Sequence, residues 1–135
     1  MDPHKIAVAR ASLDGAEQDT KAFPQIVADL MAAGFESYMI DFRQATATYY
    51  LPDGDSINLP THKVAKAVTA AFDADAIRAA IRDAQNAVPG YTYTGFCERV
   101  AAAGCAGYLV SFSGQRALYF GRTAETVVEP FPPLS

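Results

Sequence analysis

The chain has 135 residues, half of them apolar, with 19% charged residues and a formal net charge of −4. This composition excludes a mainly disordered chain. Because it has no apolar run of about 18 residues and no export-signal pattern, we expect a soluble, cytoplasmic protein without a membrane partner. Only eleven lysines and arginines are scattered along the acidic sequence, which argues against a nucleic-acid partner. We expect one domain over residues 1–135.

Two helices are predicted at the start of the chain. Residues 4–18 place apolar side chains on one helical stripe, and Ile26 and Leu30 are one turn apart in a shorter second helix. This second helix is expected to end at Gly34, because glycine readily adopts the positive φ at which helices end.

Three strands are predicted to follow as an antiparallel meander. Apolar side chains alternate onto one face in residues 38–42 and again in residues 46–50. A turn with proline and glycine at residues 51–54 leads into a short third strand at residues 56–59. The next segment, residues 61–72, is compatible with either a helix or an irregular connector.

The second half of the sequence repeats the first at a spacing of 70 residues. Residues 23–54 align with residues 93–124 without a gap, and seven aligned pairs are identical. These pairs are Ala32 and Ala102, Ala33 and Ala103, Gly34 and Gly104, Tyr38 and Tyr108, Phe42 and Phe112, Ala47 and Ala117, and Tyr49 and Tyr119. Similarity between two alanine-rich helices does not explain the glycine, tyrosine and phenylalanine matches that follow in register.

The repeat predicts an α+β fold built from duplicated helix-helix-strand-strand-strand units. We place the two units at about residues 1–60 and 71–130, with residues 61–70 as the connector. The second unit is expected to begin with a helix capped by Asp73. The strands are predicted to form an antiparallel meander sheet that helices cover, with pseudo-twofold symmetry.

The cysteines and histidines do not indicate a catalytic or metal site. Cys97 aligns with Val27 and Cys105 with Phe35, so we interpret both thiols as small side chains of the core. The two histidines lack the spacing of paired metal ligands. The sequence also contains no phosphate-binding loop, dinucleotide fingerprint or nucleophile elbow. We therefore expect no metal and no cofactor.

Tyrosines recur at matching positions of the two halves. Tyr38 and Tyr108 form one such pair, and Tyr49 and Tyr119 form the other. All four fall on the apolar faces of their predicted strands. We interpret them as two symmetric aromatic clusters beneath the helices, whose hydroxyls reach the rim of the core.

The opposite face of the predicted sheet holds the candidate binding residues. Apolar side chains such as Met39 and Leu118 are rimmed there by charged groups, a pattern typical of ligand or partner sites. An alternative is that the connector or the proline-rich tail at residues 130–133 covers this face. The candidate site residues are Asp41, Arg43, Tyr50, Arg116, Phe120 and Arg122.

Four runs of the sequence are distinctive. They read FP at 23–24, TYYLPDG at 48–54, AGY at 106–108 and YFGRT at 119–123. In these runs the chain resembles a small bacterial family of unknown function whose members are often labelled phage envelope protein, and the resemblance extends over nearly the whole chain. It implies a compact bacterial protein with some prophage-borne relatives, and it implies no activity, cofactor or catalytic residue.

Three hypotheses for the function follow. The preferred one is a non-catalytic binding module that uses the exposed sheet face to hold a small ligand, a partner protein or a second copy in a homodimer. The second is a small enzyme in which Asp41 or His62 acts as general base beside a tyrosine donor. The third is a phage structural or assembly protein that forms symmetric higher oligomers.

Overall fold

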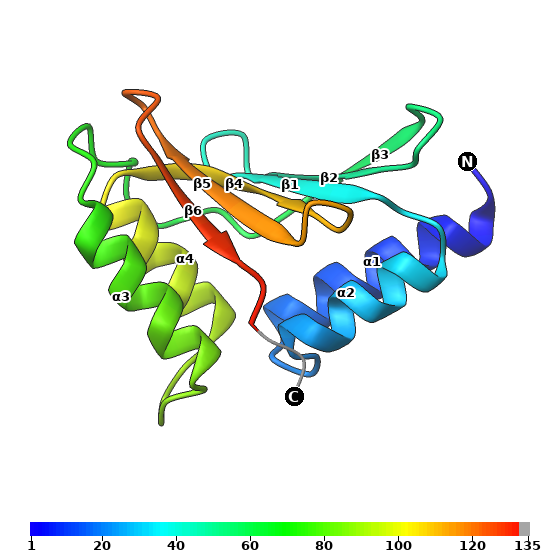
Figure 1. Ribbon diagram of the computed structural model, residues 1–135, viewed down its shortest axis with the longest axis horizontal. Coiled ribbons are helices and arrows are strands. Elements are labelled where there is room, and N and C mark those ends of the chain that lie inside the picture. Colours follow the sequence, from blue (N-terminus) through cyan, green and yellow to red (C-terminus); the bar gives the residue numbers. More distant parts are fainter. Residues whose placement is uncertain (133–135) are drawn as a thin grey trace.

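The structure, a computed structural model, describes residues 1–132 and confirms the α+β class. Within these residues four helices and a six-stranded antiparallel sheet are arranged in repeating helix-helix-strand units (Figure 1). Pro133, the last proline of the tail considered above, lies outside the described residues.

The N-terminal unit contains the predicted two helices and three strands. They are α1 (Pro3–Glu17), α2 (Phe23–Ala32), β1 (Ser37–Asp41), β2 (Thr46–Tyr50) and β3 (Ser56–Pro60). The side chain of Asp2 caps α1 by accepting a hydrogen bond of 2.8 Å from the His4 amide. Gly34, with φ +96°, follows the last turn of α2, as the sequence predicts.

The C-terminal unit follows the same order of elements. They are α3 (Ala74–Gln85), α4 (Tyr93–Ala102), β4 (Cys105–Ser111), β5 (Arg116–Gly121) and β6 (Thr126–Pro130). Asp73 caps α3 by accepting from the Ala76 amide at 3.0 Å, which confirms the predicted helix start. Gly104, with φ +98°, follows α4 in the same way that Gly34 follows α2.

The two units share one sheet, in the strand order β3-β2-β1-β4-β5-β6. The first strands of the units, β1 and β4, pair antiparallel at its centre, where Met39 lies opposite Leu109. These two residues are 70 positions apart, so the pseudo-twofold axis passes between them. Backbone hydrogen bonds obey the same relation: the Thr61 amide donates to Ala45 and the Phe131 amide donates to Gln115, both at 2.9 Å.

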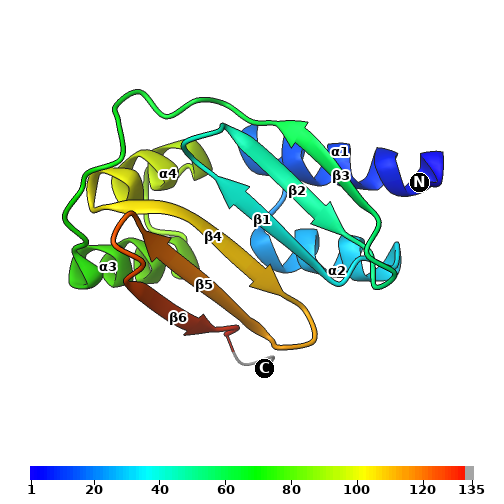
Figure 2. The same cartoon turned by 90° about the horizontal axis from the view of Figure 1, so that it is seen from above.

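The helices lie on one face of the sheet, in the pairs α1–α2 and α3–α4 (Figures 1 and 2). The buried strand residues, including Ile40 and Val110, face these helices and form the core with them. The opposite face is open. Leu109 and Val128 are exposed on it, with 37% and 47% of their surface accessible.

Neither the connector nor residues 131–132 cover the open face. The connector is not helical: it buries Val64 and Val68 in the core, and its Thr69 amide donates to Ala101 at the end of α4. Phe131 packs on the helix side, edge-on to Phe23 of α2, with their ring centroids 5.5 Å apart. The alternative that these segments cover the open face is therefore wrong for the described part of the chain.

Candidate functional site

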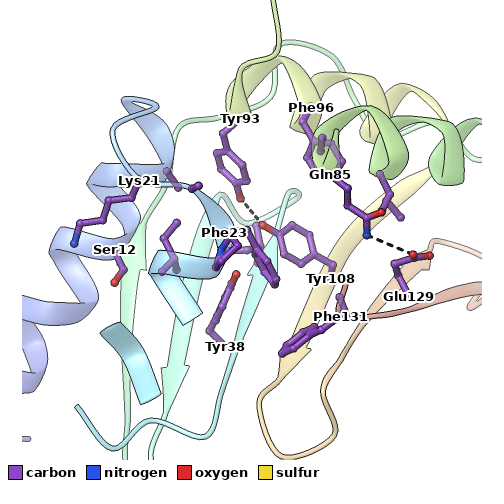
Figure 3. A pocket seen from close by; sticks show the side chains of 18 of the residues that line it. Ser12, Lys21, Phe23, Tyr38, Gln85, Tyr93, Phe96, Tyr108, Glu129 and Phe131 are labelled. Carbon is purple, nitrogen blue, oxygen red and sulfur yellow. Dashed lines mark hydrogen bonds between the residues drawn. The ribbon is translucent and has the colours of Figure 1, made fainter. Parts of the chain in front are cut away.

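A cleft of about 580 Å³ lies on the helix-covered face, between the two helix pairs (Figure 3). Residues of α1 and α2 form one wall, and residues of α3 and α4 form the other. The central strands β1, β2, β4 and β5 form its floor. The exposed residues Thr20, Pro24 and Tyr91 are part of the lining, so the cleft opens to solvent between the helices.

Tyrosines of both halves form the floor of this cleft. Tyr38, Tyr49, Tyr108 and Tyr119 are buried beneath the helices, as the sequence predicts. They form one continuous cluster instead of the two that we expected. The ring centroids of Tyr38 and Tyr108 are 6.4 Å apart because the pairing of β1 with β4 brings the two halves together.

One hydroxyl pair bridges the C-terminal wall and the floor. The hydroxyl oxygens of Tyr93, at the start of α4, and Tyr108, on β4, are 2.6 Å apart (Figure 3). One of the two hydroxyls donates to the other. The pair therefore retains one proton that is free to donate to a further acceptor.

The tyrosine hydroxyls of the cleft are neutral at physiological pH. Burial raises the pKa of Tyr38, Tyr93 and Tyr108 well above the ordinary value of tyrosine. It also raises the pKa of Tyr49 and Tyr119, and that of Tyr91 near the mouth to about 12. The lining therefore offers uncharged hydroxyls that donate and accept hydrogen bonds.

Charged side chains of the lining are already engaged. Lys21 forms an ion pair with Asp29 at 3.0 Å, and this contact holds the pKa of the Asp29 carboxyl below its usual value. The Asp19 carboxylate accepts from the Tyr93 amide at 2.8 Å, and Glu129 accepts a long hydrogen bond of 3.4 Å from Gln85. The cationic group on the lining is thus neutralised by its own neighbour.

Ser12, on the α1 wall, has a buried hydroxyl without a hydrogen-bond partner among residues 1–132. A buried polar group without a partner costs about 1–3 kcal/mol relative to one that is satisfied. The structure retains such a group in the wall of this cleft. This makes Ser12 a candidate for contact with a bound molecule or an ordered water.

Both cysteines are core residues, as the sequence predicts. Cys97 and Cys105 are fully buried, and burial raises their thiol pKa values to about 12 and about 11. The Cys105 thiol donates to the Gly107 carbonyl at 3.2 Å. Thiols with these properties remain protonated and are poor nucleophiles at neutral pH.

The candidate residues predicted from the sequence do not meet at one point on the open face. The strand register places Asp41 and Phe120 in one row across the sheet and Tyr50 and Arg116 in another. Four residues along the strands separate the two rows, a distance of about 13 Å. Tyr50 and Arg116 are themselves three strands apart, at about 14 Å. These residues therefore frame a broad surface and not a pocket.

Two of the candidates have structural contacts of their own. Asp41 accepts from the amides of Arg43 and Gln44 at 2.9 and 3.0 Å and so stabilises the turn after β1. The guanidinium of Arg122 donates to the Val68 carbonyl at 3.2 Å and holds the connector. A role of the six residues in binding stays a prediction.

The residues of the enzyme hypothesis lie on different faces of the sheet. Asp41 belongs to the open face, whereas His62 lies on the helix side, where its Nδ1 is 2.8 Å from a Glu17 carboxylate oxygen. The His62 ring packs against Tyr93 with ring centroids 6.5 Å apart, but the Tyr93 hydroxyl is paired with Tyr108. His62 Nε2 is buried without a partner in the described chain. The ring packs on the cleft residue Tyr93 but does not itself line the cleft.

Comparison with known families places the chain in one of them. The sequence profile of a family described as proteins of unknown function, DUF1398, matches residues 6–129. The chain belongs to this family. No curated protein matches the sequence. Membership in DUF1398 therefore assigns no activity to the chain. The phage association implied by the resemblance stays a prediction.

The helices and the acidic, histidine and cysteine side chains of this DUF1398 protein bear on membranes and metals. None of the helices in residues 1–132 has both the length and the apolar character needed to cross a bilayer. Within the same residues, no three or more histidine, cysteine, aspartate or glutamate side chains are grouped as metal ligands would be.

Sequence reasoning identified the tyrosines of this DUF1398 protein but not the cleft that they line. The recurrence of Tyr38 and Tyr49 at positions 108 and 119 was the available signal. We interpreted it as packing because aromatic side chains on a buried strand face usually fill space. The separation of the two helix pairs, which makes these rings the floor of a cleft, has no counterpart in a local sequence pattern.

Proposed function

We propose that this DUF1398 protein binds a small, mainly apolar organic molecule in the cleft between its two helix pairs. The observation that carries the proposal is the cavity of about 580 Å³, lined mainly by aromatic and aliphatic side chains with a few polar groups. Cavities of roughly 300–1,000 Å³ with this kind of lining are typical of small-molecule sites.

The position of the cleft supports the proposal. Its two walls belong to different repeats, and the floor belongs to both, so each half contributes to one shared site. Tyr38 and Tyr108 stand on central strands of the sheet, which hold their rings in place. A site with a fixed floor loses little conformational entropy when a ligand binds.

An uncharged fluorescent probe, N-phenylnaphthylamine, tests the proposal directly. We expect its emission to rise in the presence of the protein and to saturate at one probe per chain. Ala16 lines the α1 wall of the cleft, so Ala16→Phe should fill part of the cavity and lower the affinity for the probe at least about ten-fold. Ala11, exposed on the same helix, provides the matched control Ala11→Phe, which should bind as the wild type does.

Two outcomes would contradict the proposal: no saturable probe binding, or equal weakening by the variant and its control. If Ala16→Phe unfolds, Ala84→Phe on the opposite wall replaces it. Native mass spectrometry of freshly purified protein adds an independent result. A reproducible extra mass per chain supports a cleft ligand, whereas a dimer without added mass favours the open sheet face and a larger symmetric assembly favours the structural hypothesis.

A further inference from the structure

The two halves of the cleft differ in how they satisfy one buried hydroxyl. In the C-terminal half, the Tyr108 hydroxyl is paired with that of Tyr93. The residue aligned with Tyr93 in the N-terminal half is Phe23, which has no hydroxyl. The hydroxyl of Tyr38, the counterpart of Tyr108, consequently has no hydrogen-bond partner among residues 1–132.

The Tyr38 hydroxyl is directed into the cleft. Tyr38 as a whole is 95% buried. Its hydroxyl oxygen nevertheless keeps some contact with open space, whereas the Ser12 oxygen is fully enclosed. Tyr38 lines the cavity, and Figure 3 shows its hydroxyl pointing toward the space next to the Tyr93–Tyr108 pair. A deeply buried hydroxyl that lines the cavity and has no partner in the described chain is available to a bound molecule.

The charge of the lining restricts what that molecule can be. Lys21 is already paired with Asp29, so no free cation is present on the described lining to neutralise an anion. The side chains of Asp19 and Glu129 add negative charge at the edge of the cleft. Moving an ionised group into an apolar cavity without a partner is strongly unfavourable.

We propose that the cleft selects an uncharged, mainly apolar molecule that carries one hydroxyl or carbonyl oxygen, and that this oxygen hydrogen-bonds to the Tyr38 hydroxyl. The inference rests on the proposed function of the cleft and adds the chemical class of its ligand. The paired hydroxyls of Tyr93 and Tyr108 lie beside this position and provide a second donor. The hydroxyls of Tyr49 and Tyr119 keep the rest of the floor polar but neutral.

A series of four probes with the same ring system tests this class. Naphthalene, naphthol, naphthoate and naphthylmethylammonium are titrated separately against the complex of the protein with N-phenylnaphthylamine, and displacement gives each affinity. We expect naphthol to bind about five-fold more tightly than naphthalene, which is the gain typical of one net hydrogen bond. Naphthoate and naphthylmethylammonium should both bind at least about ten-fold more weakly than naphthol.

Tyr38→Phe should lower the affinity for naphthol to that for naphthalene and leave the affinity for naphthalene unchanged. Tyr50→Phe is the matched control, since Tyr50 lies on the opposite face of the sheet, outside the cleft. It should change neither affinity.

The outcomes separate the two proposals. Failure of all probes to bind overturns the proposed function itself. If either charged probe binds more tightly than the uncharged ones, or if Tyr38→Phe does not change the affinity for naphthol, the ligand class is overturned. The cleft then remains a binding site. If Tyr50→Phe lowers the probe affinities and Tyr38→Phe does not, the binding site is on the open face.

Discussion

The N-terminal and C-terminal units have the same backbone path but different side chains around it. Equivalent turns adopt the same unusual conformations: φ is +55° at Ala45 and +51° at Gln115. The conserved path includes the glycines after the second helices, Gly34 and Gly104, at +96° and +98°. The side chains that meet in the cleft match only in part: the tyrosines of the floor recur in both halves, but the hydroxyl of Tyr93 is absent from its counterpart, Phe23.

This difference separates the requirements of the fold from those of the site. Features that the halves share, such as the turns and the buried strand faces, are sufficient to build the sheet twice. Features that differ between the halves are not required to build the sheet. The pairing of the floor hydroxyl belongs to the second group: Tyr108 is paired with Tyr93, whereas Tyr38 has no hydrogen-bond partner within residues 1–132, which is why we propose Tyr38 for ligand binding.

The largest expected effect is alkaline unfolding, which involves the buried tyrosines of both halves. Because burial raises the pKa of tyrosines on both halves of the floor, the folded state retains protons that the unfolded state loses above about pH 10. The contribution of these tyrosines to the free energy of unfolding should be constant below that pH and then fall by about 1.4 kcal/mol per pH unit for each such tyrosine. Tyrosinate absorbance at 295 nm, followed with far-ultraviolet circular dichroism, checks this. Ionisation of these tyrosines without loss of structure would contradict it.

A second prediction compares the two helix-ending glycines. In Gly104→Ala the new methyl group would collide with the backbone carbonyl of Ala71, whereas in Gly34→Ala it would meet only the flexible Lys5 side chain, 2.9 Å away. Both variants bear the cost of positive φ, about 1 kcal/mol. We expect a loss of about 1 kcal/mol for Gly34→Ala and about 3 kcal/mol for Gly104→Ala in urea denaturation. Equal losses would mean that the connector yields at Ala71.

A third prediction concerns the equivalent tyrosines of the central strands. Tyr108→Phe leaves the Tyr93 hydroxyl without its partner and should cost about 1.5 kcal/mol of stability in the ligand-free protein. Tyr38→Phe removes a hydroxyl that has no partner in the described chain and should change stability by less than about 0.5 kcal/mol. Thermal and urea unfolding of the two variants, measured side by side, test the asymmetry. It is refuted if the two losses are the same.

The smallest expected effect is a gain. Ser12→Ala removes a buried hydroxyl without a partner and should stabilise the ligand-free protein by about 0.5–1 kcal/mol. Ser37→Ala, a similar change on the half-buried open face of β1, serves as the control and should be nearly neutral. A loss of stability in Ser12→Ala would indicate that a bound water or ligand satisfies the serine in solution.

Much of the fold could be predicted from the sequence because its signals are local. The period-two alternation around Tyr38 and Tyr49, the cap at Asp73 and the glycines after the helices each depend on a few neighbouring residues. The 70-residue repeat then transferred every assignment from one half to the other. The connector was ambiguous because Val64 and Val68 are spaced as in a helix, whereas its Thr69 amide bonds to Ala101 at the end of α4.

The candidate site depends on contacts that no local pattern encodes. The pairing of β1 with β4 joins residues about 70 positions apart, and it alone merges the tyrosines of the two halves. The apolar character of the open face was visible in the sequence and is present in the structure at Leu109 and Val128. The separation of the helix pairs was not visible, because it is set by how each pair packs on a twisted sheet.

The antiparallel pairing of β1 with β4 also bears on the ancestry of the fold. Two separate copies of a half-length chain, related by a true twofold axis, would build the same six-stranded sheet and the same cavity. In such an ancestor every change on one wall would be repeated on the other. Joining the copies in one gene removes that coupling, so positions 23 and 93 can differ, as Phe23 and Tyr93 do. Fusion thereby turns a symmetric cavity into one with two distinguishable ends, and the proposed ligand would then be held in a single orientation.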